Sequence, residues 1–592
     1  MSFGTETGLP DESNAHTRVP LPYGNPDSHE TPGTITNVPA RHATEQALSD
    51  IWSDLLEPER ISITDNFFDL GGHSLLAGQM MGRIARTFGV SLPIKTIFEA
   101  PTVETLARRI DAALAARVPT PSPDSPMLEV PRFGEGGPVL PSLTQEQMMQ
   151  AERALPGLPQ FNLPFALRLQ GPLDLAALKK ALVQVVRRHE ALRTAFDWEG
   201  EAVLAQVAAP ETIGPMLEVF DMDAGSEERV KRLTLKRARL FAEQEAWAPI
   251  DPAHAPLARA RLLRLSSDDH LLLLTFHHGV ADGWSIGLLF GEISSAYSAL
   301  RGRRSLAPAL APAVARPFSD FARWQRQWCT TGEAAAQLAY WRENLRDVAP
   351  IFAKAGAHPG PRPGTPTAHE PVQLQNGLIA QLTRFSAGQN GTLFIALLTG
   401  LKALLLKQTG RKDLCIATAM ANRTGADMER VIGPFENTVI IRTQFEPELS
   451  FTEAFARVRE SVLEAHARQE LPFNILAARL AEEDGIDPAS LIQVYFTLQN
   501  PLRQPLKLPD ITVRSFGNVH REGQPVLPID QTWLSLMLKE RPSGVTGSCA
   551  YKSALFAGQT ITQWMEGYAA ILSSGVAHPD LPLARLLARK AA

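Results

Sequence analysis

The feature that most constrains the fold is an apolar run of strand length, His270–Phe276 (HLLLLTF), followed at once by residues 277–283 (HHGVADG). Such a run predicts a strand that is buried on both faces. After Gly283, apolar residues recur at helical spacing at Ile286, Leu289, Phe290, Ile293 and Tyr297. We therefore expect a strand, a corner and a helix, with two imidazoles in the corner.

A corner of this kind is a good position for chemistry, because a rigid sheet holds the loop in place. Histidine suits it because the unperturbed pKa of imidazole lies near neutrality, so a small change of environment lets the ring take or give a proton. Taken alone, a histidine pair is more often structural than catalytic. A zinc site needs further ligands at regular spacing, and His254, His270, Cys329, Cys415 and Cys549 do not supply them. We predict no metal.

Length and charge exclude several classes of protein. The 592 residues suggest about four structural units. The net charge of -5, with scattered Lys and Arg, provides no basic stripe for nucleic acid. Three cysteines argue against a disulfide scaffold and for a reducing cytosol, and we find neither a signal peptide nor an apolar run long enough to span a membrane. We expect a cytoplasmic protein with no nucleic-acid or membrane partner.

The N-terminal part divides into a leader and a small helical unit. Residues 1–40 are rich in Pro, Gly and small polar side chains, which predicts a flexible leader; whether it docks a partner stays open. Residues 41–117 show helical spacing and short connections, which predicts a small antiparallel bundle. Its first helix carries Leu48, Ile51, Trp52 and Leu55. A second helix begins at Ser74, and Thr102 is the expected N-cap of the last one.

Residues 65–76 (DNFFDLGGHSLL) join the first two helices of this bundle. The glycine pair lets the backbone turn sharply and leaves Ser74 accessible at a helix start. The alternative is that Ser74 only caps its helix. The stretch closely resembles the DxFFxLGGHSL signature of peptidyl carrier domains from nonribosomal peptide synthetases. This resemblance implies that a phosphopantetheinyl transferase attaches a 4'-phosphopantetheine arm to Ser74, and that the thiol of the arm holds an aminoacyl or peptidyl thioester.

A linker and a second, larger unit follow. Residues 117–138 hold six prolines, which predicts an extended linker at 118–137. Residues 188–196 (RHEALRTAF) come after an amphipathic helix. Together with the histidine corner, they resemble the RHExLRTxF and HHxxxDG motifs of the condensation domain, the natural neighbour of a peptidyl carrier. Residues 318–328 (FSDFARWQRQW) and 432–438 (IGPFENT) match two further motifs in the order of that family.

The chain departs from the family pattern at three places. The opening motif, roughly SxAQxRLW, reads SLTQEQMM at residues 142–149. A second stretch, HQDxPFE, reads RQELPFN at residues 468–474, and Gly279 stands where a β-branched residue is usual. None of these changes removes the candidate catalytic group, but they leave the condensation subtype open.

The resemblance also implies the fold. We expect a small all-α four-helix carrier bundle plus an α/β (α+β) condensation domain of two lobes. Each lobe is of the chloramphenicol-acetyltransferase type, a sheet flanked by helices, and the two meet as a V around a tunnel. We place the N-lobe at 138–310 and the C-lobe at 311–592, because prolines punctuate the chain near Leu310. The proline-rich patch Pro359–Pro371 is expected to be a surface loop of the C-lobe.

The family chemistry is the attack of an acceptor amine on an acyl-donor thioester. His278 is the candidate to accept the ammonium proton or to hold the attacking nitrogen by a hydrogen bond, and the sequence leaves both roles open. His277 belongs to the same candidate catalytic set. By analogy with the family, Asp282 forms a structural salt bridge with an arginine, for which we expect Arg193. The amide of Gly283, at a helix start, is placed to polarise the thioester carbonyl.

Two other functions stay open: ester formation or chain release with an alcohol acceptor, and a non-catalytic scaffold that recruits partners to a loaded carrier. The intact HHxxxDG motif argues against the scaffold, and the IGPFENT and GGHS sequences argue against a related epimerase. We find no phosphate loop of an adenylating domain and no GxSxG elbow. We therefore expect an adenylation enzyme acting in trans, with an acceptor carrier protein or a free amine as the second substrate. The domain order predicts that Ser74 presents the acyl donor.

Overall fold

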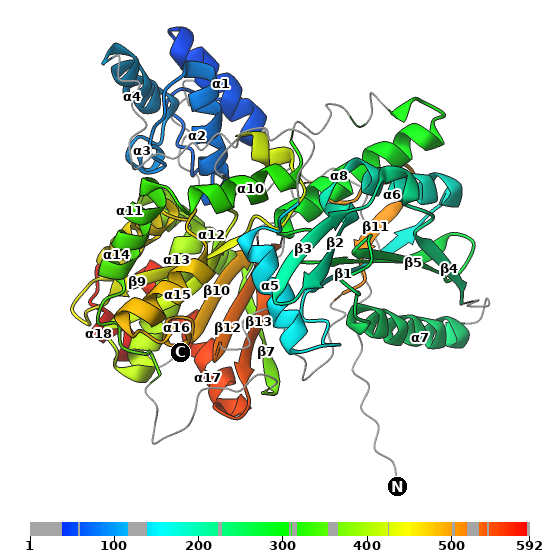
Figure 1. The fold of residues 1–592 in the computed structure, drawn as a ribbon. Coiled ribbons are helices and arrows are strands. Elements are labelled where there is room, and N and C mark those ends of the chain that lie inside the picture. The colour runs from blue at the N-terminus through cyan, green and yellow to red at the C-terminus, as the bar shows by residue number, and fades with distance from the viewer. Residues whose placement is uncertain are drawn as a thin grey trace.

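The computed structural model describes residues 38–56, 58, 60–116, 139–222, 228–306, 310, 316–352, 365–423, 426–499, 504–517, 532–541 and 544–588. Most of the leader predicted at 1–40 and all of the linker predicted at 118–137 lie outside these residues. The described chain forms a small helical bundle and a larger body of two lobes (Figure 1).

The bundle consists of α1 (Ala43–Leu56), α2 (Ser74–Phe88), α3 (Lys95–Glu99) and α4 (Val103–Ala115). Trp52 and Phe67 are fully buried at its centre and meet edge to face, with 5.5 Å between their ring centroids. Thr102 caps α4, as the sequence predicts, in a capping box with Thr105. The all-α carrier fold is thus confirmed.

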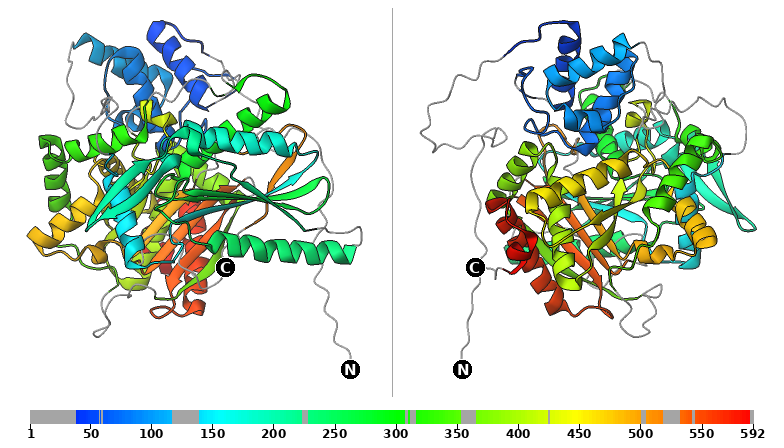
Figure 2. Two further views of the ribbon diagram at one scale, coloured as in Figure 1. Left: turned by 45° about the vertical axis from the view of Figure 1, so that its right-hand side comes forward. Right: turned by 90° about the vertical axis from the view of Figure 1, so that its left-hand side faces the viewer.

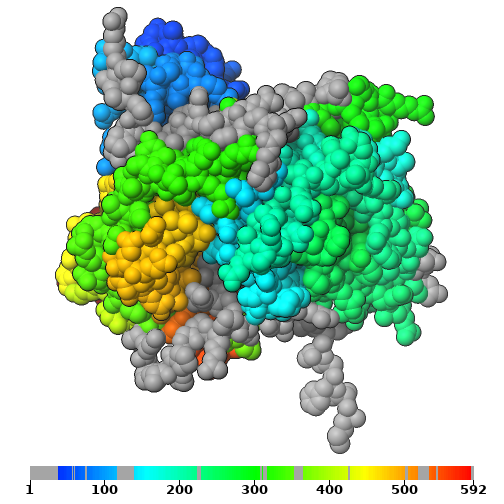
Figure 3. All heavy atoms as spheres, viewed as in Figure 1, coloured from blue at the N-terminus to red at the C-terminus, as the bar shows by residue number. Residues whose placement is uncertain are grey.

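The bundle projects from the C-lobe side of the body (Figures 2 and 3). Helix α2 contacts the short helix η3 (Ala426–Arg430). The Nζ atom of Lys95, at the start of α3, lies 3.1 Å from the carboxylate of Glu460 on α14 (Phe451–His466). Both side chains of this ion pair are about half exposed, so the pair adds little stability and mainly orients the two surfaces.

The N-lobe is built on a five-stranded sheet of order β11-β1-β6-β5-β4. Its strands are β1 (Asn162–Gln170), β4 (Leu217–Asp221), β5 (Ala258–Arg264), β6 (Asp269–His277) and β11 (Thr512–Ser515). Helices on its two faces are α6 (Leu175–Arg188) with α8 (Gly283–Arg301), and α7 (Glu228–Trp247) on the opposite side (Figure 1). The lobe also contains α5 (Leu143–Ala154), η1 (Ala191–Arg193), η2 (Pro210–Thr212) and the hairpin of β2 (Thr194–Glu199) and β3 (Ala202–Val207).

Strand β6 runs through the middle of this sheet, antiparallel to β1 on one side and to β5 on the other. Its side chains alternate between two cores. Leu272 and Leu274 belong to the core that includes α6 and α8. Leu271 and Leu273 pack in the core of α7. The prediction of a strand buried on both faces is confirmed, and this double burial explains why the segment is apolar at consecutive positions.

The C-lobe is built on a six-stranded sheet of order β7-β13-β12-β10-β8-β9. Its strands are β7 (Thr367–Gln375), β8 (Asp413–Met420), β9 (Asn437–Gln444), β10 (Val494–Gln499), β12 (Leu534–Arg541) and β13 (Gly544–Lys552). Besides α14, its helices are α10 (Phe318–Trp328), α11 (Gly332–Asn344), α12 (Asn376–Gly388), α13 (Leu393–Thr409), α15 (Phe473–Asp484), α16 (Pro488–Leu491), α17 (Gly558–Ala577) and α18 (Leu583–Ala588). Each lobe is therefore a sheet with helices, as expected.

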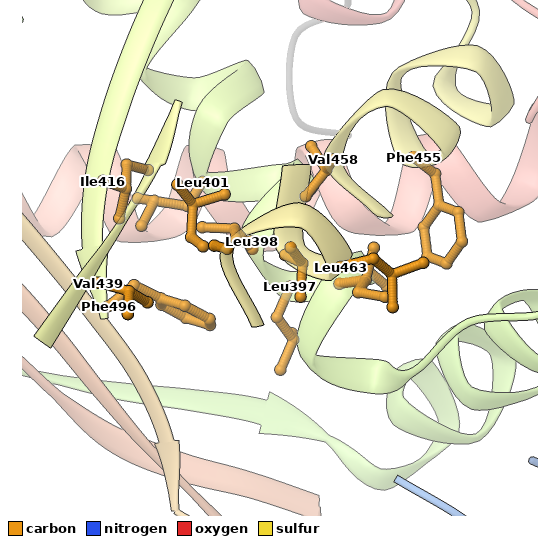
Figure 4. Packing of buried hydrophobic residues seen from close by; sticks show 14 of the residues in the cluster. Leu397, Leu398, Leu401, Ile416, Val439, Phe455, Val458, Leu463 and Phe496 are labelled. Carbon is orange, nitrogen blue, oxygen red and sulfur yellow. The ribbon is translucent and has the colours of Figure 1, made fainter. Parts of the chain in front are cut away.

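Helix α13 is the centre of the C-lobe core, and its residues from Ile395 to Leu406 are buried without interruption. Figure 4 shows Leu401 close to Ile416 of β8, and Leu397 and Leu398 between the strands and α14. Because α13 has neighbours on all sides, apolar residues predominate around its whole circumference.

Two features of the segment assigned to the C-lobe differ from the predictions. Strand β11, from the segment assigned to the C-lobe, pairs antiparallel with β1 in the N-lobe sheet, from Leu167↔Ser515 to Gln170↔Thr512. Residues 359–364 of the patch Pro359–Pro371 lie outside the described residues. The prediction of a loop is wrong from Thr367 on, where β7 begins and places Pro371 opposite Ser548. Strand β7 lies at the sheet edge, where a proline without an N–H group is tolerated.

Within the described residues, no single helix has both the length and the apolar character needed to cross a membrane. Helices α12 and α13, which are bent by 105° relative to each other, meet these two criteria only as a pair.

A lysine lies inside the C-lobe core. The side chain of Lys402 on α13 is fully buried, and its Nζ atom donates to the carbonyl oxygens of Leu414 and Ile441, each at 2.8 Å. Burial lowers the pKa of Lys402 from 10.5 to about 7. The nearby Cys415 and Asp413 oppose this change only in part. The ammonium form is therefore disfavoured in the folded chain.

This buried amine predicts a pH dependence of stability. Between pH 7 and 8.5 the unfolded chain binds more protons at Lys402 than the folded chain does, so stability rises with pH. We expect the wild type to gain about 1.5 kcal/mol more over this interval than Lys402→Met, measured by urea unfolding. Lys407→Met, at an exposed position of the same helix, is the control and should keep the wild-type slope. Equal slopes in all three proteins would contradict the prediction.

Candidate functional site

The turn before α2 is shaped by close packing at a glycine. Gly71 has a φ of +91°, and a Cβ atom at Gly72 would overlap the ring and carbonyl of Phe67. The N-cap of α2 is His73, whose Nδ1 atom accepts a hydrogen bond from the amide of Leu76 at 3.4 Å. Ser74 is the first residue of the helix proper. The alternative in which Ser74 caps this helix is therefore wrong.

This geometry fits the attachment of a phosphopantetheine arm at Ser74. Glycine is required at position 72 because the chain passes directly over Phe67. His73, not Ser74, supplies the N-cap of the helix. The amides of the first helical turn also favour a phosphate at this end of α2.

The histidine corner lies where β6 ends and α8 begins. His277 is the last residue of β6, and the amide of His278 donates to the carbonyl of Phe161 at 2.7 Å. Asp282 is the N-cap of α8, and its Oδ1 atom accepts from the amide of Ser285 at 2.8 Å. Gly283 is the first helical residue, where backbone amides have no partner within the helix. The structure thus places all four residues in one corner.

The ring of His277 is held at both nitrogens. Its Nδ1 atom accepts from the amide of Gly279 at 2.9 Å, which leaves Nε2 to donate to the carboxylate of Glu152 at 3.0 Å. A Cβ atom at position 279 would lie 2.8 Å from this same Nδ1 atom, so the glycine is coupled to the ring position. The carbonyl of Gly279 accepts from Gln145 of the opening motif at 2.8 Å.

The ring of His278 is buried, with 6% of its surface exposed. Its Nδ1 atom has no hydrogen-bond partner among the described residues, in contrast to the ring of His277. A buried polar nitrogen without a partner is costly, and such groups concentrate where a substrate supplies the missing bond. Within this pair, His278 is therefore the imidazole whose Nδ1 atom is not held by the described protein.

The carboxylate of Asp282 is bound by Arg423 from the C-lobe. Nη2 of Arg423 lies 3.0 Å from Oδ1 and 3.1 Å from Oδ2, and both side chains are almost completely buried. The amide of Phe435 donates to Oδ2 at 3.1 Å. Burial lowers the pKa of Arg423, while the charge of Asp282 raises it. The pair joins the two lobes directly behind the histidine corner.

The prediction that Arg193 is the ion-pair partner of Asp282 is wrong. Arg193 ends the short helix η1, and its Nη1 atom donates to the carbonyl of Ala208. Burial lowers the pKa of its guanidinium, while the charges of Glu190 and Glu211 raise it. Its motif holds the N-lobe together instead, because His189 contacts Glu292 on α8 at 2.8 Å.

A pattern in the sequence also marks Arg423. It follows the buried strand β8 by three residues, much as Asp282 follows the buried strand β6. Polar residues directly after such strands are candidates for a shared site, because strand ends are where a rigid sheet presents side chains.

The two motifs at 318–328 and 432–438 pack against each other at this place. The ring of Phe435 lies 5.0 Å from that of Phe318 and 4.5 Å from that of Phe321. A side chain at Gly433 would overlap Phe318, so that position needs a glycine. The guanidinium carbon of Arg423 lies 4.0 Å above the Phe435 ring. These aromatic rings keep water away from the ion pair.

The loop that contacts the carrier bundle is tied to the same corner. Nη1 of Arg423 donates to the carbonyls of Met428 and Val431, each at 2.7 Å. Nε1 of Trp284, in the first turn of α8, donates to the carbonyl of Glu429 at 2.8 Å. Because α2 contacts this η3 segment, the bundle rests on a loop whose position depends on Arg423.

Comparisons with known protein families match both parts of the chain. A family model described as "Phosphopantetheine attachment site" matches residues 46–110, and one described as "Condensation domain" matches residues 139–591. Among curated relatives, one of the linear gramicidin synthase proteins of Brevibacillus parabrevis is 35% identical over 93% of this chain. Malpibaldin synthetase of Mortierella alpina is 32% identical over 90% of it. The chain spans only 10% and 9% of the length of these two relatives.

Solved structures show the same fold for the larger unit. The X-domain from teicoplanin biosynthesis is 24% identical, with a TM-score of 0.62 over 77% of this chain and 99% of that one. The first condensation domain of the calcium-dependent antibiotic synthetase is 20% identical, with a TM-score of 0.61 over 76% of this chain and 99% of that one. The two-lobed fold class expected from the sequence is confirmed.

The new assignment of the ion pair is testable with double-mutant cycles. Asp282→Asn and Arg423→Gln should each destabilise the chain by about 3 kcal/mol, because each leaves one buried charge unpaired. Their coupling energy should be about 1 to 3 kcal/mol in urea unfolding of the full chain. The control cycle combines Asp282→Asn with Arg193→Gln and should be additive. A larger coupling to Arg193 than to Arg423 would refute the assignment.

Proposed function

The chain belongs to the condensation-domain family and carries a phosphopantetheine attachment domain ahead of that domain, and on this premise we propose that it transfers an acyl group from its own carrier to an acceptor amine. The product is an amide, as in nonribosomal peptide synthesis. The proposed site of the arm is Ser74, and the proposed reaction site is His278. The domain borders that go with this proposal are 41–117 for the carrier, 118–137 for the linker, and 138–310 and 311–592 for the two lobes.

One observation carries the proposal. The carrier helix that begins at Ser74 contacts η3, and η3 is bonded through Arg423 to the corner that holds His278. The loading point and the reaction site are therefore parts of one connected structure. A carrier that only passed its cargo to another protein would not need this connection.

The attached arm would supply a thiol that holds the acyl donor as a thioester. The protein then has to bring an acceptor nitrogen to the donor carbonyl, and much of the rate comes from holding the two reactants together. A C–N bond forms, the C–S bond breaks, and the sulfur leaves as a thiol after it has received a proton. His278 accepts the proton of the attacking nitrogen or holds that nitrogen by a hydrogen bond.

The other residues of the corner keep His278 in position. His277 is fixed by Gly279 and Glu152, so it sets the path of the backbone on which His278 stands. Asp282 caps α8 and binds Arg423, which fixes the corner against the C-lobe. The Gly283 amide, at the positive end of α8, is the proposed donor to the carbonyl oxygen as it gains charge.

The proposal implies partners and a compartment. A phosphopantetheinyl transferase has to modify Ser74, and an adenylation enzyme acting in trans has to supply the acyl group. The second substrate is an acceptor carrier protein or a free amine. We place the reaction in the cytoplasm, because the three cysteines are free in the structure and coenzyme A, the source of the arm, is an intracellular cofactor.

Loss of the attachment site should prevent loading. We expect Ser74→Ala to gain no mass when the full chain is incubated with coenzyme A and a broad phosphopantetheinyl transferase, while the wild type gains one arm per chain in intact-mass spectrometry. Ser53→Ala, at an exposed position on α1, is the matched control and should load like the wild type. Loading of Ser74→Ala would show that the arm is attached elsewhere.

Loss of His278 should stop transfer without affecting loading. We expect His278→Ala to accept the arm fully and to reduce single-turnover acyl transfer by about 100-fold or more, the usual contribution of a positioned acid or base. His254→Ala, whose ring is largely exposed in the same lobe, should transfer at the wild-type rate. Undiminished transfer by His278→Ala would refute catalysis by His278 and favour a domain that only recruits or positions the substrates.

A further inference from the structure

A second carboxyl group approaches the histidine corner from the C-lobe. Glu436 lies between two residues whose positions are fixed. The amide of Phe435 is bonded to Asp282 at 3.1 Å. The side-chain amide of Asn437 donates to the carbonyls of Gln469 and Leu471 at 2.7 and 2.8 Å. With both neighbours held, the backbone at Glu436 has one position relative to His278.

The contact of Phe435 with Asp282 brings Glu436 next to the corner, and the charges of the corner act on its carboxyl. Burial raises the pKa of Glu436, the charge of His278 lowers it, and the charge of Asp282 raises it again. Each of these interactions requires the groups to be near one another. His278 belongs to the N-lobe and Glu436 to the C-lobe, so the two side chains lie on opposite sides of the junction between the lobes.

Asp282 and Glu436 differ in how far their carboxyl groups are occupied by described residues. The oxygens of Asp282 are already occupied by Arg423, Ser285 and Phe435. Glu436 makes no hydrogen bond or ion pair with any residue that the structure describes, and its side chain is partly exposed. The neighbouring phenol of Tyr495 is bonded to Thr438, and burial together with the charge of Glu436 raises its pKa, so it stays neutral.

A carboxyl group in such a place is costly unless a cation compensates it, and an apolar residue would be less costly. Among the described residues whose charges act on the pKa of Glu436, His278 alone can become cationic, and its ring nitrogen Nδ1 is also without a partner. An incoming ammonium group would compensate the carboxylate and bring the reacting nitrogen to the imidazole at the same time.

We propose that Glu436 binds the ammonium group of the acceptor beside His278 and thereby selects amine over alcohol acceptors. This inference rests on the proposed acyl transfer. The acceptor enters as an ammonium ion paired with Glu436, and one proton passes to His278 and then to solvent. The free amine attacks the acyl carbonyl, the C–N bond forms, the C–S bond breaks, and the second proton goes to the leaving sulfur. A hydroxyl acceptor has no positive charge for Glu436 to bind.

The test compares two acceptor probes that differ only in the reacting group. Glycyl-aminopantetheine carries an ammonium group, and glycolyl-aminopantetheine carries a hydroxyl group in its place. Their affinities for the full chain are measured by calorimetry, which needs no acyl donor. We expect the wild type to bind the glycyl probe about tenfold more tightly, as one charge-assisted hydrogen bond allows. Glu436→Gln should lose this preference through weaker binding of the glycyl probe alone.

Glu448→Gln is the control, because it neutralises an exposed carboxylate of the same lobe, and it should keep the wild-type preference. The proposal is overturned if Glu436→Gln keeps the preference, if it weakens both probes equally, or if the wild type binds neither probe.

Single-turnover transfer separates this proposal from the function on which it rests. With chains loaded from acetyl coenzyme A, transfer to the glycyl probe that depends on His278 but is unchanged in Glu436→Gln would refute only the role of Glu436. Equal transfer by the wild type and His278→Ala would refute the proposed catalysis itself. Glu436→Asp should recover part of the amine preference, because it restores the charge at a shorter reach.

Discussion

The ion pair between Asp282 and Arg423 is the interaction on which the functional part of this structure depends. The two residues are 141 positions apart in the chain and belong to different lobes. Arg423 also binds two carbonyls around η3, the segment that the carrier contacts. A buried pair of this kind brings little net stability compared with apolar packing, but removal of one partner is expensive. The pair instead fixes geometry. It holds the histidine corner, the junction between the lobes and the η3 segment in fixed positions relative to one another.

The two adjacent histidines illustrate how such a corner divides structural and chemical tasks. His277 uses both ring nitrogens for protein partners, Gly279 and Glu152, and is therefore unable to exchange protons with a substrate without breaking these bonds. His278 uses its backbone amide for structure, through Phe161, while its ring nitrogen Nδ1 has no partner among the described residues. Successive side chains at the end of a strand point to opposite sides, so consecutive residues can have these different roles.

The parts of the fold that the sequence predicted well are those set by local physics. The strand before the corner was predictable because both of its faces are buried, and the start of α4 because Thr102 forms a capping box with a residue three positions on. The corner itself follows from local order, since His277, His278, Asp282 and Gly283 lie within one turn between two elements. The carrier turn follows for the same reason.

What the sequence did not predict depends on contacts between distant segments. The prediction of Arg193 failed because the position of Arg423 just after a buried strand marks it only as a candidate. Its pairing with Asp282 depends on the β6 and β8 ends meeting across the lobes. The pairing of β11 with the N-lobe sheet was not predicted either. A strand of only four residues has no clear sequence pattern of its own.

Two of the connections between the lobes would resist their separation. One is the ion pair behind the corner, and the other is the ladder between β1 and β11, which connects the chain of the C-lobe to the sheet of the N-lobe. Opening the junction widely would break buried charge contacts at the first point and backbone hydrogen bonds at the second. A wide separation of the lobes is therefore costly.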